Sequence, residues 1–283
     1  MTDEYGLLDE EATDAPGDEW EALDVSDTEV DRTARTQDRE FAKFRERIKD
    51  ADQFKVEGGV FDEATLGALY TLVQHDHIDA LGGPISTGKE AHVFLASAGE
   101  RDVAVKIYRI NASDFTQMRQ YLEGDPRFDD IGNKKKKVVL AWTKKEFANL
   151  KRAKRAGLRV PEPLAVERNA LVMEFLGTDG ERAKRLGEVH LENPETAYEV
   201  VREYMRRLHR AGLVHGDLSE YNVLVHDSQL WVIDLGQAVT VHHPNSREFL
   251  ERDCENVANF FTRQGLDVDG ERLLAEVTAA RED

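Results

Sequence analysis

Residues 214–237 read VHGDLSEYNVLVHDSQLWVIDLGQ, and the prediction of the fold rests on them. Two short apolar runs, 222–225 and 230–235, lie on either side of the turn-forming residues 227–229, which is the pattern of a β-hairpin. Polar side chains stand at the open end of this predicted hairpin with a fixed spacing: Asp217, Asn222 and Asp234. The stretch therefore predicts two carboxylates and an amide gathered at one end of a hairpin.

Such a gathering suits a magnesium site, because like charges placed together cost stability unless a cation or a substrate separates them. In protein kinases, an H-R-D-L-x-x-x-N loop supplies the catalytic Asp and a metal-binding Asn, and D-F-G supplies the second metal ligand. Residues 215–218 (HGDL) followed by Asn222 keep that spacing, and Asp234 begins the sequence DLG. The alternative is a hairpin with ordinary polar ends, but a full register is far more specific than a lone glycine motif.

Length and charge limit the classes of function. The chain has 283 residues, enough for two lobes, and a formal net charge of -18. Residues 1–31 carry thirteen acidic residues and no Lys or Arg, which leaves -5 for the rest of the chain. Such a segment cannot bury enough surface to order itself, so we expect a disordered tail there. The overall acidity argues against non-specific coating of nucleic acid, and we expect no DNA partner.

Cysteine usage and hydropathy point to a cytoplasmic protein. The single cysteine, Cys254, excludes an intramolecular disulfide and a cysteine-based zinc cluster. Leu250, Val257 and Phe261 share a helical face with it, so we expect a buried, inert thiol. No apolar run approaches the roughly 18 residues of a membrane span, and the acidic start is unlike a signal peptide. We therefore expect no membrane partner.

A change of period marks a predicted sheet. Residues 85–95 read as a strand, a tight loop and a second strand, and residues 103–108 (VAVKIY) read as a third. Small loop residues let backbone N–H groups approach phosphate oxygens, which makes four residues candidates for nucleotide binding: Ser86, Thr87, Gly88 and Lys89. Residues 83–89 also fit the P-loop pattern G-x-x-x-x-G-K, but Glu90 stands where Ser or Thr must contact Mg2+, which disfavours a P-loop NTPase.

Lys106 lies inside the third predicted strand and has a candidate partner. In the kinase V-A-I-K strand the lysine contacts the α- and β-phosphates and pairs with a glutamate on a helix. Residues 142–156 predict a helix closed by Gly157, and Glu146 is its only acid. We therefore predict an ion pair between Lys106 and Glu146 that holds the lysine toward a nucleotide. The alternative is an outward-facing lysine that serves solubility.

Residues 109–137 predict a long loop, because glycine and proline breakers interrupt them. Ser113 and Thr116 are candidate sites of self-phosphorylation if this loop folds back over the site. Basic residues form an island in the loop and the helix after it: Lys134, Lys135, Lys136, Lys137, Lys144, Lys145, Lys151, Arg152, Lys154 and Arg155. An RNA or ribosome contact and a solvated helix face explain this basic island equally well.

The remaining segments complete two predicted lobes. Residues 163–166 and 170–176 predict a hairpin that ends in MEFLG, an extended segment able to offer backbone groups to an adenine edge. Further helices are predicted at 33–49, 62–75, 196–210, 245–263 and 270–280, with Asp62 and Asn245 as N-caps. We divide the chain into an acidic tail at 1–31, a helical extension at 32–77, an amino-terminal lobe at 78–173 and a carboxy-terminal lobe at 174–283.

Six segments resemble, in order and spacing, the Rio family of atypical protein kinases, type 1 subgroup: ISTGKEAHVF, AVKIYR, WTKKEFANLKR, LVMEFLG, HGDLSEYN and IDLGQAV. The resemblance covers residues 78–264, and the chain is similar to compact archaeal members of the subgroup. It implies an α+β, two-lobed protein-kinase-like fold. An antiparallel sheet with one helix would form the amino-terminal lobe, and a reduced, mainly helical lobe would follow.

The resemblance also implies roles for individual residues. ATP would be the co-substrate, with Mg2+ or alternatively Mn2+ as the metal. Lys106 would contact the phosphates, held by Glu146; Glu174 and Leu176 would bind adenine through backbone atoms; Asp217 would be the catalytic base; and the metal ligands would be Asn222 and Asp234. In this family the Asp at the D-F-G position can become an aspartyl phosphate, which would make Asp234 a covalent intermediate. The implied function is a self-phosphorylating serine/threonine kinase and ATPase in maturation of the small ribosomal subunit, with its precursor RNA and protein as partners.

Departures from ordinary kinases leave the substrate open. Gly216 replaces the arginine of H-R-D, no A-P-E follows, and only 47 residues come after Gly236. There is too little chain for the usual peptide-docking lobe, so self-phosphorylation or ATP turnover is easier to accommodate. Two other functions remain. One is a small-molecule kinase of the aminoglycoside or choline type, which also has H-G-D-L. The other is an ATP-gated assembly factor that binds pre-ribosomal RNA or protein and releases it on hydrolysis.

Overall fold

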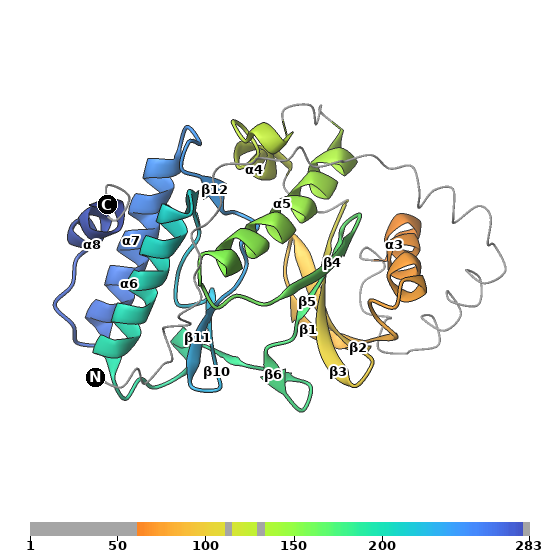
Figure 1. Cartoon of the computed structure of the whole chain (residues 1–283), viewed down its shortest axis with the longest axis horizontal. Coiled ribbons are helices and arrows are strands. Elements are labelled where there is room, and N and C mark those ends of the chain that lie inside the picture. The colour runs from red at the N-terminus through yellow and green to blue at the C-terminus, as the bar shows by residue number, and fades with distance from the viewer. Residues whose placement is uncertain (1–60, 111–114, 129–133, 280–283) are drawn as a thin grey trace.

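The computed structural model describes residues 61–110, 115–128 and 134–279, which form two lobes (Figure 1). The amino-terminal lobe is built on an antiparallel sheet with the strand order β1-β2-β3-β5-β4. Its strands span β1 Ala80–Thr87, β2 Ala91–Ala98, β3 Arg101–Tyr108, β4 Pro163–Glu167 and β5 Ala170–Glu174. The three expected strands of residues 85–108 and the expected hairpin of residues 163–176 are therefore present.

The central strand β3 is buried on both faces, and its alternation aims Lys106 at the interior of the protein. Val103, Val105 and Ile107 pack in one cluster with α3 (Glu63–Gln74). The side chains between them point the other way, because successive residues of a strand face opposite sides of its sheet. Lys106 therefore faces α5 (Lys135–Arg155) and is only 6% exposed. The alternative of an outward-facing, solvated lysine is wrong.

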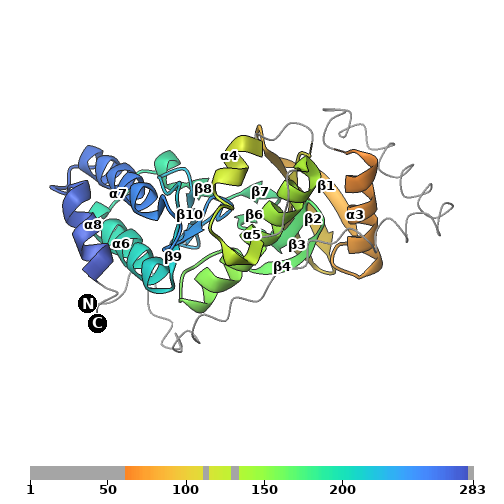
Figure 2. The same ribbon diagram turned by 90° about the horizontal axis from the view of Figure 1, so that it is seen from above.

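Helix α3 covers the outer face of the sheet, opposite α5 (Figure 2). It begins where the sequence predicts, since the Asp62 carboxylate accepts a hydrogen bond from the backbone N–H of Thr65 at 2.8 Å. Its apolar side chains pack against Phe94 and Val105 of the sheet. The helix expected at 33–49 and the acidic tail at 1–31 lie outside the described residues.

Helix α5 begins at Lys135, seven residues before the expected start at Trp142. The basic run that opens it is therefore helical, since the four residues that follow, 138–141, are all buried and dock the first turns on the protein. The segment before it, expected as loop, contains α4 (Phe115–Gln120) and a 3-10 turn at Pro126–Phe128. The basic island also loses two members, because Lys145 is fully buried and Arg152 donates to the Ala211 carbonyl.

The carboxy-terminal lobe is mainly helical and carries small sheets at its junction with the first lobe (Figure 1). Its helices are α6 Pro194–Arg210, α7 Ser246–Arg263 and α8 Gly270–Ala279, with a 3-10 turn at Leu186–Glu188. Its short strands are β6 Gly177–Thr178, β7 Glu181–Arg182, β8 Lys184–Arg185, β9 Leu213–Val214, β10 Val223–His226, β11 Gln229–Val232 and β12 Val239–Thr240. One apolar core joins these helices to the hairpin β10–β11.

The predicted hairpin is present, with a tighter turn than expected. Strands β10 and β11 pair from Val223–Val232 to His226–Gln229, so only Asp227 and Ser228 form the loop. Their φ angles are 50° and 59°, the left-handed conformation that a two-residue hairpin turn requires. The turn matches the right-handed twist of the strands and sets the register that places the hairpin's open end.

The prediction that the Asn245 side chain caps a helix is wrong. Helix α7 starts at Ser246 as expected, but the Asn245 side chain accepts no hydrogen bond from its first backbone N–H groups. The backbone N–H of Asn245 instead donates to Nδ1 of His243 at 3.1 Å. Further along the same helix Cys254 is buried, as expected, and burial raises the pKa of its thiol to about 12, which makes it inert.

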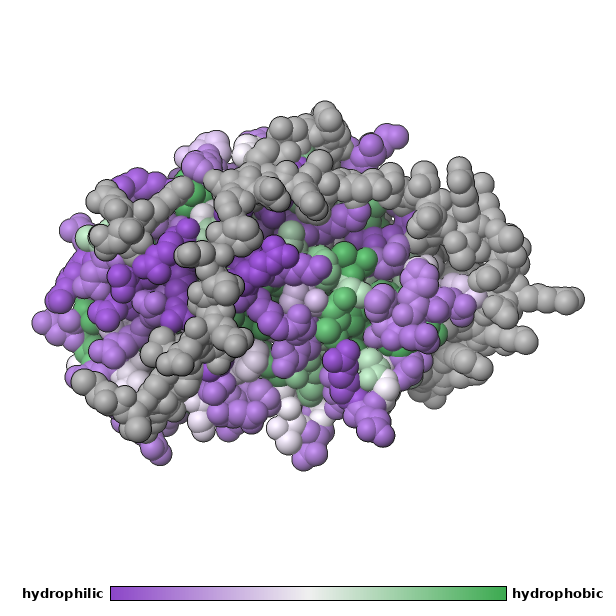
Figure 3. Space-filling model, in the orientation of Figure 1, coloured by the Kyte–Doolittle hydropathy of each residue, from purple (hydrophilic) through white to green (hydrophobic). Residues whose placement is uncertain are grey.

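No helix among residues 61–110, 115–128 and 134–279 is both long and apolar enough to cross a bilayer. The coloured residues on the face seen in Figure 3 are mostly hydrophilic, with a smaller hydrophobic area near the centre of the view.

We expect Leu72→Ala to lower the free energy of unfolding by about 2–5 kcal/mol, because Leu72 is 1% exposed in the contact between α3 and the sheet and its loss leaves a cavity. Gln74→Ala, at an exposed position of the same helix, is the control and should change stability by no more than about 0.5 kcal/mol. Urea unfolding measures both. Equal effects of the two substitutions would show that α3 does not contribute to the core.

Candidate active site

Lys106 lies between two carboxylates at the centre of the site. Its Nζ is 2.8 Å from Oε1 of Glu146 on α5 and 2.8 Å from Oδ1 of Asp234, which follows β11. The Tyr108 hydroxyl donates to the other Glu146 oxygen. The predicted ion pair between Lys106 and Glu146 is confirmed, and the contact with Asp234 joins the two lobes through one ammonium group.

The pKa shifts of these groups follow from one cation shared by two anions. Burial alone would lower the pKa of Lys106, but Asp234 and Glu146 outweigh it and raise that pKa well above its ordinary value. Burial raises the pKa of Glu146, which has only 1% of its side chain exposed. Burial would also raise the pKa of Asp234, but attraction to Lys106 lowers it overall, and its side chain is 49% exposed. Asp234 is therefore an ionised carboxylate that is still open to the cleft.

Asp217 and Asn222 are held together in the loop before β10. The Asn222 amide donates to the Asp217 carbonyl at 2.7 Å and to its Oδ2 at 3.3 Å. Burial and then the charge of Asp234 raise the pKa of Asp217, so the two carboxylates are close enough to repel each other. His215 Nε2 donates to the Ile233 carbonyl at 3.1 Å and ties this loop to the residue before Asp234.

Side chains of helix α7 bind the backbone of the loop that carries Asp217. This contact was not predicted from the sequence. Both Asp253 oxygens accept backbone N–H groups, from Gly216 and Leu218, each at 2.7 Å. Arg252 donates to the Gly216 carbonyl. Burial raises the pKa of Asp253 to about 7. The available signal was an acid on the buried face of the predicted helix, next to Cys254.

The glycines of this site are required by its geometry. Gly216 has a φ of 78°, and a Cβ there would lie 3.0 Å from the Gln237 carbonyl oxygen. A Cβ on Gly236 would lie 2.9 Å from both the Trp142 indole nitrogen and the Tyr108 hydroxyl. Glycine therefore replaces the arginine of H-R-D at position 216 because the backbone conformation and the nearby carbonyl disfavour a side chain there.

Helix α5 also fixes the segment after Asp234. Lys145 Nζ donates to the Gly236 carbonyl at 2.8 Å. The Asn149 amide donates to the carbonyls of Leu235 and Ala238 at 3.1 and 2.9 Å. Asn149 lies three positions after Glu146, on the same helix face, which was the signal in the sequence. Two side chains of one helix thus bind three carbonyls of residues 235–238.

A buried pair from the segment before α5 supports Asn149. Arg127 forms an ion pair with Asp125 at 2.6 Å and donates to Oδ1 of Asn149 at 3.1 Å. Burial, and then the charge of Arg127, lowers the pKa of Lys145 to about 7. Part of the stretch expected to be loop is therefore a structural support of the site.

The residues predicted to cover the phosphates, 86–89, lie at the end of β1 and in the turn after it. Ser86 and Thr87 end β1, and Gly88 closes the turn with its N–H on the Ala91 carbonyl at 2.9 Å. Thr87, Gly88 and Lys89 are exposed. No described contact joins these residues to Lys106, so their role stays a prediction.

The candidate adenine-binding residues follow β5. The Glu174 N–H already donates to the Glu162 carbonyl at 2.9 Å, so the Glu174 carbonyl is the group left to face a base. The Leu176 carbonyl accepts a hydrogen bond from the Ala183 N–H at 2.8 Å, so the N–H of Leu176 is the candidate group for adenine binding. Adenine binding at these two residues stays a prediction.

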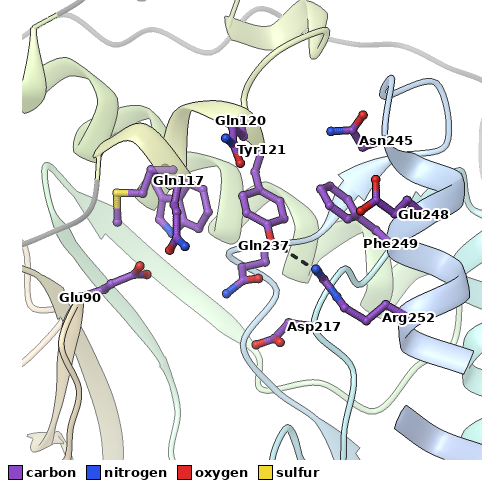
Figure 4. A pocket seen from close by; sticks show the side chains of 12 residues that line it. Glu90, Gln117, Gln120, Tyr121, Asp217, Gln237, Asn245, Glu248, Phe249 and Arg252 are labelled. Carbon is purple, nitrogen blue, oxygen red and sulfur yellow. Dashed lines mark hydrogen bonds between the residues drawn. The ribbon is translucent and has the colours of Figure 1, made fainter. Parts of the chain in front are cut away.

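A cavity of about 440 Å³ adjoins Asp217 (Figure 4). Both lobes line it, through Glu90, Gln117, Met118, Gln120, Tyr121, Trp142, Asp217, Gln237, Asn245, Glu248, Phe249 and Arg252. Of the two candidate acceptors for self-phosphorylation, Thr116 is exposed on α4 directly before Gln117, whereas Ser113 lies outside the described residues. The cavity was not predicted, because its walls come from distant segments.

The donor atoms beside Asp217 suit a hard cation. Asp234 and Asn222 carry carboxylate and amide oxygens, the ligand type that Mg2+ and Mn2+ take from proteins. Among the described residues no group of three His, Cys, Asp or Glu side chains is placed to hold a metal on its own. A cation here would therefore share its shell with phosphate oxygens and water.

Known proteins similar to this chain identify its family. Residues 92–273 match the family model described as RIO domain. This chain belongs to the RIO domain family. It is 69% identical over 279 residues to "RIO-type serine/threonine-protein kinase Rio1" of Haloferax volcanii, which covers 98% of this chain and 96% of the relative. It is 38% identical over 244 residues to the Rio1 kinase of Methanocaldococcus jannaschii, covering 85% and 84% of the two chains.

The RIO relatives confirm two expectations from the sequence. Both are Rio1 proteins, which confirms the type 1 resemblance, and the chain is a kinase of the RIO type. The solved structure of the "Rio2 kinase-ADP/Mg2+-phosphoaspartate complex from Chaetomium thermophilum" matches with a TM-score of 0.57 and 23% identity, covering 77% of this chain and 69% of that one. The α+β, two-lobed kinase-like fold is therefore confirmed.

We expect Lys145→Met to remove a pH dependence of stability. The folded protein holds Lys145 with a pKa of about 7, below its ordinary 10.5, so only the unfolded chain binds that proton between these values. The free energy of unfolding of the native chain therefore rises with pH in that window, by at most about 1.4 kcal/mol per unit, while below pH ~7 the penalty is constant.

Denaturant unfolding at pH values near both ends of this window measures the effect. Lys151→Met, at an exposed position of α5, is the control and should keep the native pH dependence. If the free energy of unfolding of Lys145→Met rises with pH as much as that of the native chain, Lys145 is not a buried, titrating lysine beside Gly236.

Proposed function

We propose that this RIO-family chain is an ATP- and Mg2+-dependent serine/threonine protein kinase with ATPase activity. The observation that carries the proposal is Lys106, held between Glu146 and Asp234 at 2.8 Å from each, with the raised-pKa carboxyl of Asp217 in the adjoining loop. That set supplies a phosphate-binding cation and two carboxylates of different protonation behaviour, as phosphoryl transfer requires. Family membership over nearly the whole chain supports the same conclusion.

In the proposed reaction the protein acts mainly by positioning and electrostatics. Lys106 binds the α- and β-phosphates, the Glu174 carbonyl and Leu176 N–H orient adenine, and the backbone of residues 86–89 covers the phosphates. Asp217 accepts the proton of the attacking hydroxyl, a role that its raised pKa favours because a more basic carboxylate takes up a proton more readily. We propose that residues 78–173 and 174–283 form the two lobes and that the nucleotide binds between them.

We propose Asn222 and Asp234 as ligands of Mg2+, with Mn2+ as the alternative. The metal would neutralise charge on the β- and γ-phosphate oxygens. Asp234 fits this role because its Oδ1 contacts Lys106 while the side chain remains half exposed to the cleft. Asn222 fits because its amide N–H bonds to Asp217 turn the carboxamide so that its oxygen is not used there.

Asp234 is also the proposed site of a covalent intermediate. A carboxylate oxygen would bond to the γ-phosphorus of ATP as the bond from phosphorus to the β–γ bridging oxygen breaks and ADP leaves with the electron pair. Water, losing its proton to Asp217, would then hydrolyse the acyl phosphate. The lowered pKa of Asp234 keeps the nucleophile ionised, and the solved Rio2 kinase of similar fold is described as a phosphoaspartate complex.

For the physiological role we propose maturation of the small ribosomal subunit, with precursor RNA and protein as partners. The family resemblance supports it, and so do exposed basic residues of α5: Lys135, Lys137, Lys151, Lys154 and Arg155. The same surface serves the ATP-gated assembly factor, which would bind and release the precursor by nucleotide state. Co-sedimentation with small-subunit precursors in ATP and in ADP tests this role. The small-molecule kinase is disfavoured, because the chain belongs to the RIO family.

We expect Asp217→Ala and Asp234→Ala each to lower turnover of ATP at least ~100-fold, the scale of losing a positioned base or a charge stabiliser. Asp102→Ala, at an exposed position of β3, is the matched control and should retain native turnover. Release of labelled phosphate from γ-labelled ATP measures all three. Native rates in either site variant would overturn the assignment.

We expect the phosphorylated protein to carry label on a carboxylate. Incubation with γ-labelled ATP and Mg2+ should give protein-bound label that hydroxylamine removes, and Asp234→Asn should abolish that fraction. Label that is stable to acid and hydroxylamine would instead lie on a hydroxyl, with Thr116 as the first described candidate. Finding only the stable form would refute the covalent intermediate and leave the kinase assignment in place.

A further inference from the structure

The cavity beside Asp217 lies between α4, α7 and the segments that follow β9 and β11. Asp217 and Gln237 line it from the catalytic segments, and α7 lines it with Glu248 and Arg252. The chain passes from Gly236 to the start of α7 through residues 237–245 alone, so no long activation segment is inserted there. Figure 4 shows the Asp217 carboxylate at the edge of this space, beneath Tyr121 and the side chains of α4.

The walls of the cavity are fixed in place across the two lobes. His243 Nε2 donates to the Gln120 carbonyl at 2.7 Å, which joins the end of α4 to the segment before α7. Tyr121 stacks on Phe249 with centroids 4.9 Å apart and meets Trp142 edge-on at 5.8 Å. The volume of about 440 Å³ lies within the roughly 300–1,000 Å³ of ordinary ligand sites. The cavity is therefore a formed site with an aromatic wall.

Charge determines which acceptor the cavity fits. Two carboxylates, those of Asp217 and Glu248, line it against one guanidinium, that of Arg252, while Glu90 also lines it but has an interaction of its own. The Arg252 guanidinium already donates to the Gly216 carbonyl and to the Tyr121 hydroxyl, and it lies 5.0 Å over the Phe249 ring. The net charge of the lining therefore attracts a cation, and the aromatic wall adds a favourable surface for one.

We propose that this cavity is the acceptor subsite and that it takes a polypeptide segment in which Lys or Arg neighbours the Ser or Thr to be phosphorylated. The hydroxyl lies at Asp217, and the basic side chain lies against the carboxylate of Glu248, across the cavity from Glu90 (Figure 4). The inference rests on the proposed kinase function and adds its substrate class. It names Glu248 as the specificity-determining residue.

Binding of fluorescent peptides tests the proposal without requiring turnover. Three peptides share a central Ser and carry Arg, Gln or Glu at the two positions on either side. Each is titrated by fluorescence anisotropy with and without a non-hydrolysable ATP analogue and Mg2+, and nucleotide uptake is measured separately by calorimetry. We expect the Arg peptide to bind at least ~10-fold more tightly than the Gln peptide, with a preference that falls as salt rises.

Two variants locate the effect. Glu248→Lys should remove most of the Arg preference through like-charge repulsion, and Glu248→Gln should reduce it about 2- to 5-fold, the effect of losing one ion pair. Glu255→Lys makes the same charge change at an exposed position of α7 outside the cavity and should keep the preference. Thermal unfolding of each variant shows that it is folded.

The outcomes separate this inference from the proposed function. An Arg preference that is absent in the native chain, or unchanged in Glu248→Lys, overturns the inference, as does tighter binding of the Glu peptide through Arg252. Loss of nucleotide uptake in the native chain would overturn the kinase function itself. Nucleotide uptake together with an Arg preference lost only in the cavity variants supports both.

Discussion

The ammonium group of Lys106, shared by Glu146 and Asp234, is the interaction on which the rest of the site depends. It brings together β3, α5 and the end of the hairpin β10–β11. A buried ion pair stabilises little by itself, but removing one partner leaves a buried charge and costs about 3–5 kcal/mol. The arrangement therefore commits all three elements to one geometry. Because the Glu146 side chain is buried and that of Asp234 is half exposed, only Asp234 can exchange the lysine for a ligand.

Hydrogen bonds to backbone groups then fix the two loops that carry Asp217 and Asp234. Helix α5 binds the carbonyls after Asp234 through Lys145 and Asn149, and helix α7 binds the N–H groups around Asp217 through Asp253. These contacts fix both loops through their backbones and do not use the side chains of Asp217 and Asp234. They also hold Asp234 at a φ of 62°, a conformation that an L-residue adopts at a cost and that persists where the surroundings impose it. Two helices thus supply the rigidity that a hairpin end lacks.

The sequence was sufficient where chemistry lies at fixed spacing along the chain. The apolar runs on either side of residues 227–229 predicted the hairpin, and the periods around Lys106 and Glu146 predicted the strand and the helix that meet. It was insufficient where a side chain binds a distant backbone. Lys145 read as one more member of a basic run, although it is fully buried against Gly236, 91 positions away. The start of α5 was missed because burial of residues 138–141, not an N-cap, orders its first turns. The cavity was missed because segments near positions 90, 120 and 250 build it together.

The charges of the site determine how a nucleotide can enter it. Lys106 is one cation facing Glu146 and Asp234, and the ionised form of Asp217 adds a third negative charge nearby. A bare triphosphate would meet a site that is already net negative, and the coulombic cost would exceed what a single lysine returns. A divalent cation that arrives with the phosphates reverses this balance, since it attracts Asp234 and the phosphate oxygens together. On this argument the proposed nucleotide would bind as its metal complex, and Asp234 would hold the metal while Glu146 keeps Lys106 in place.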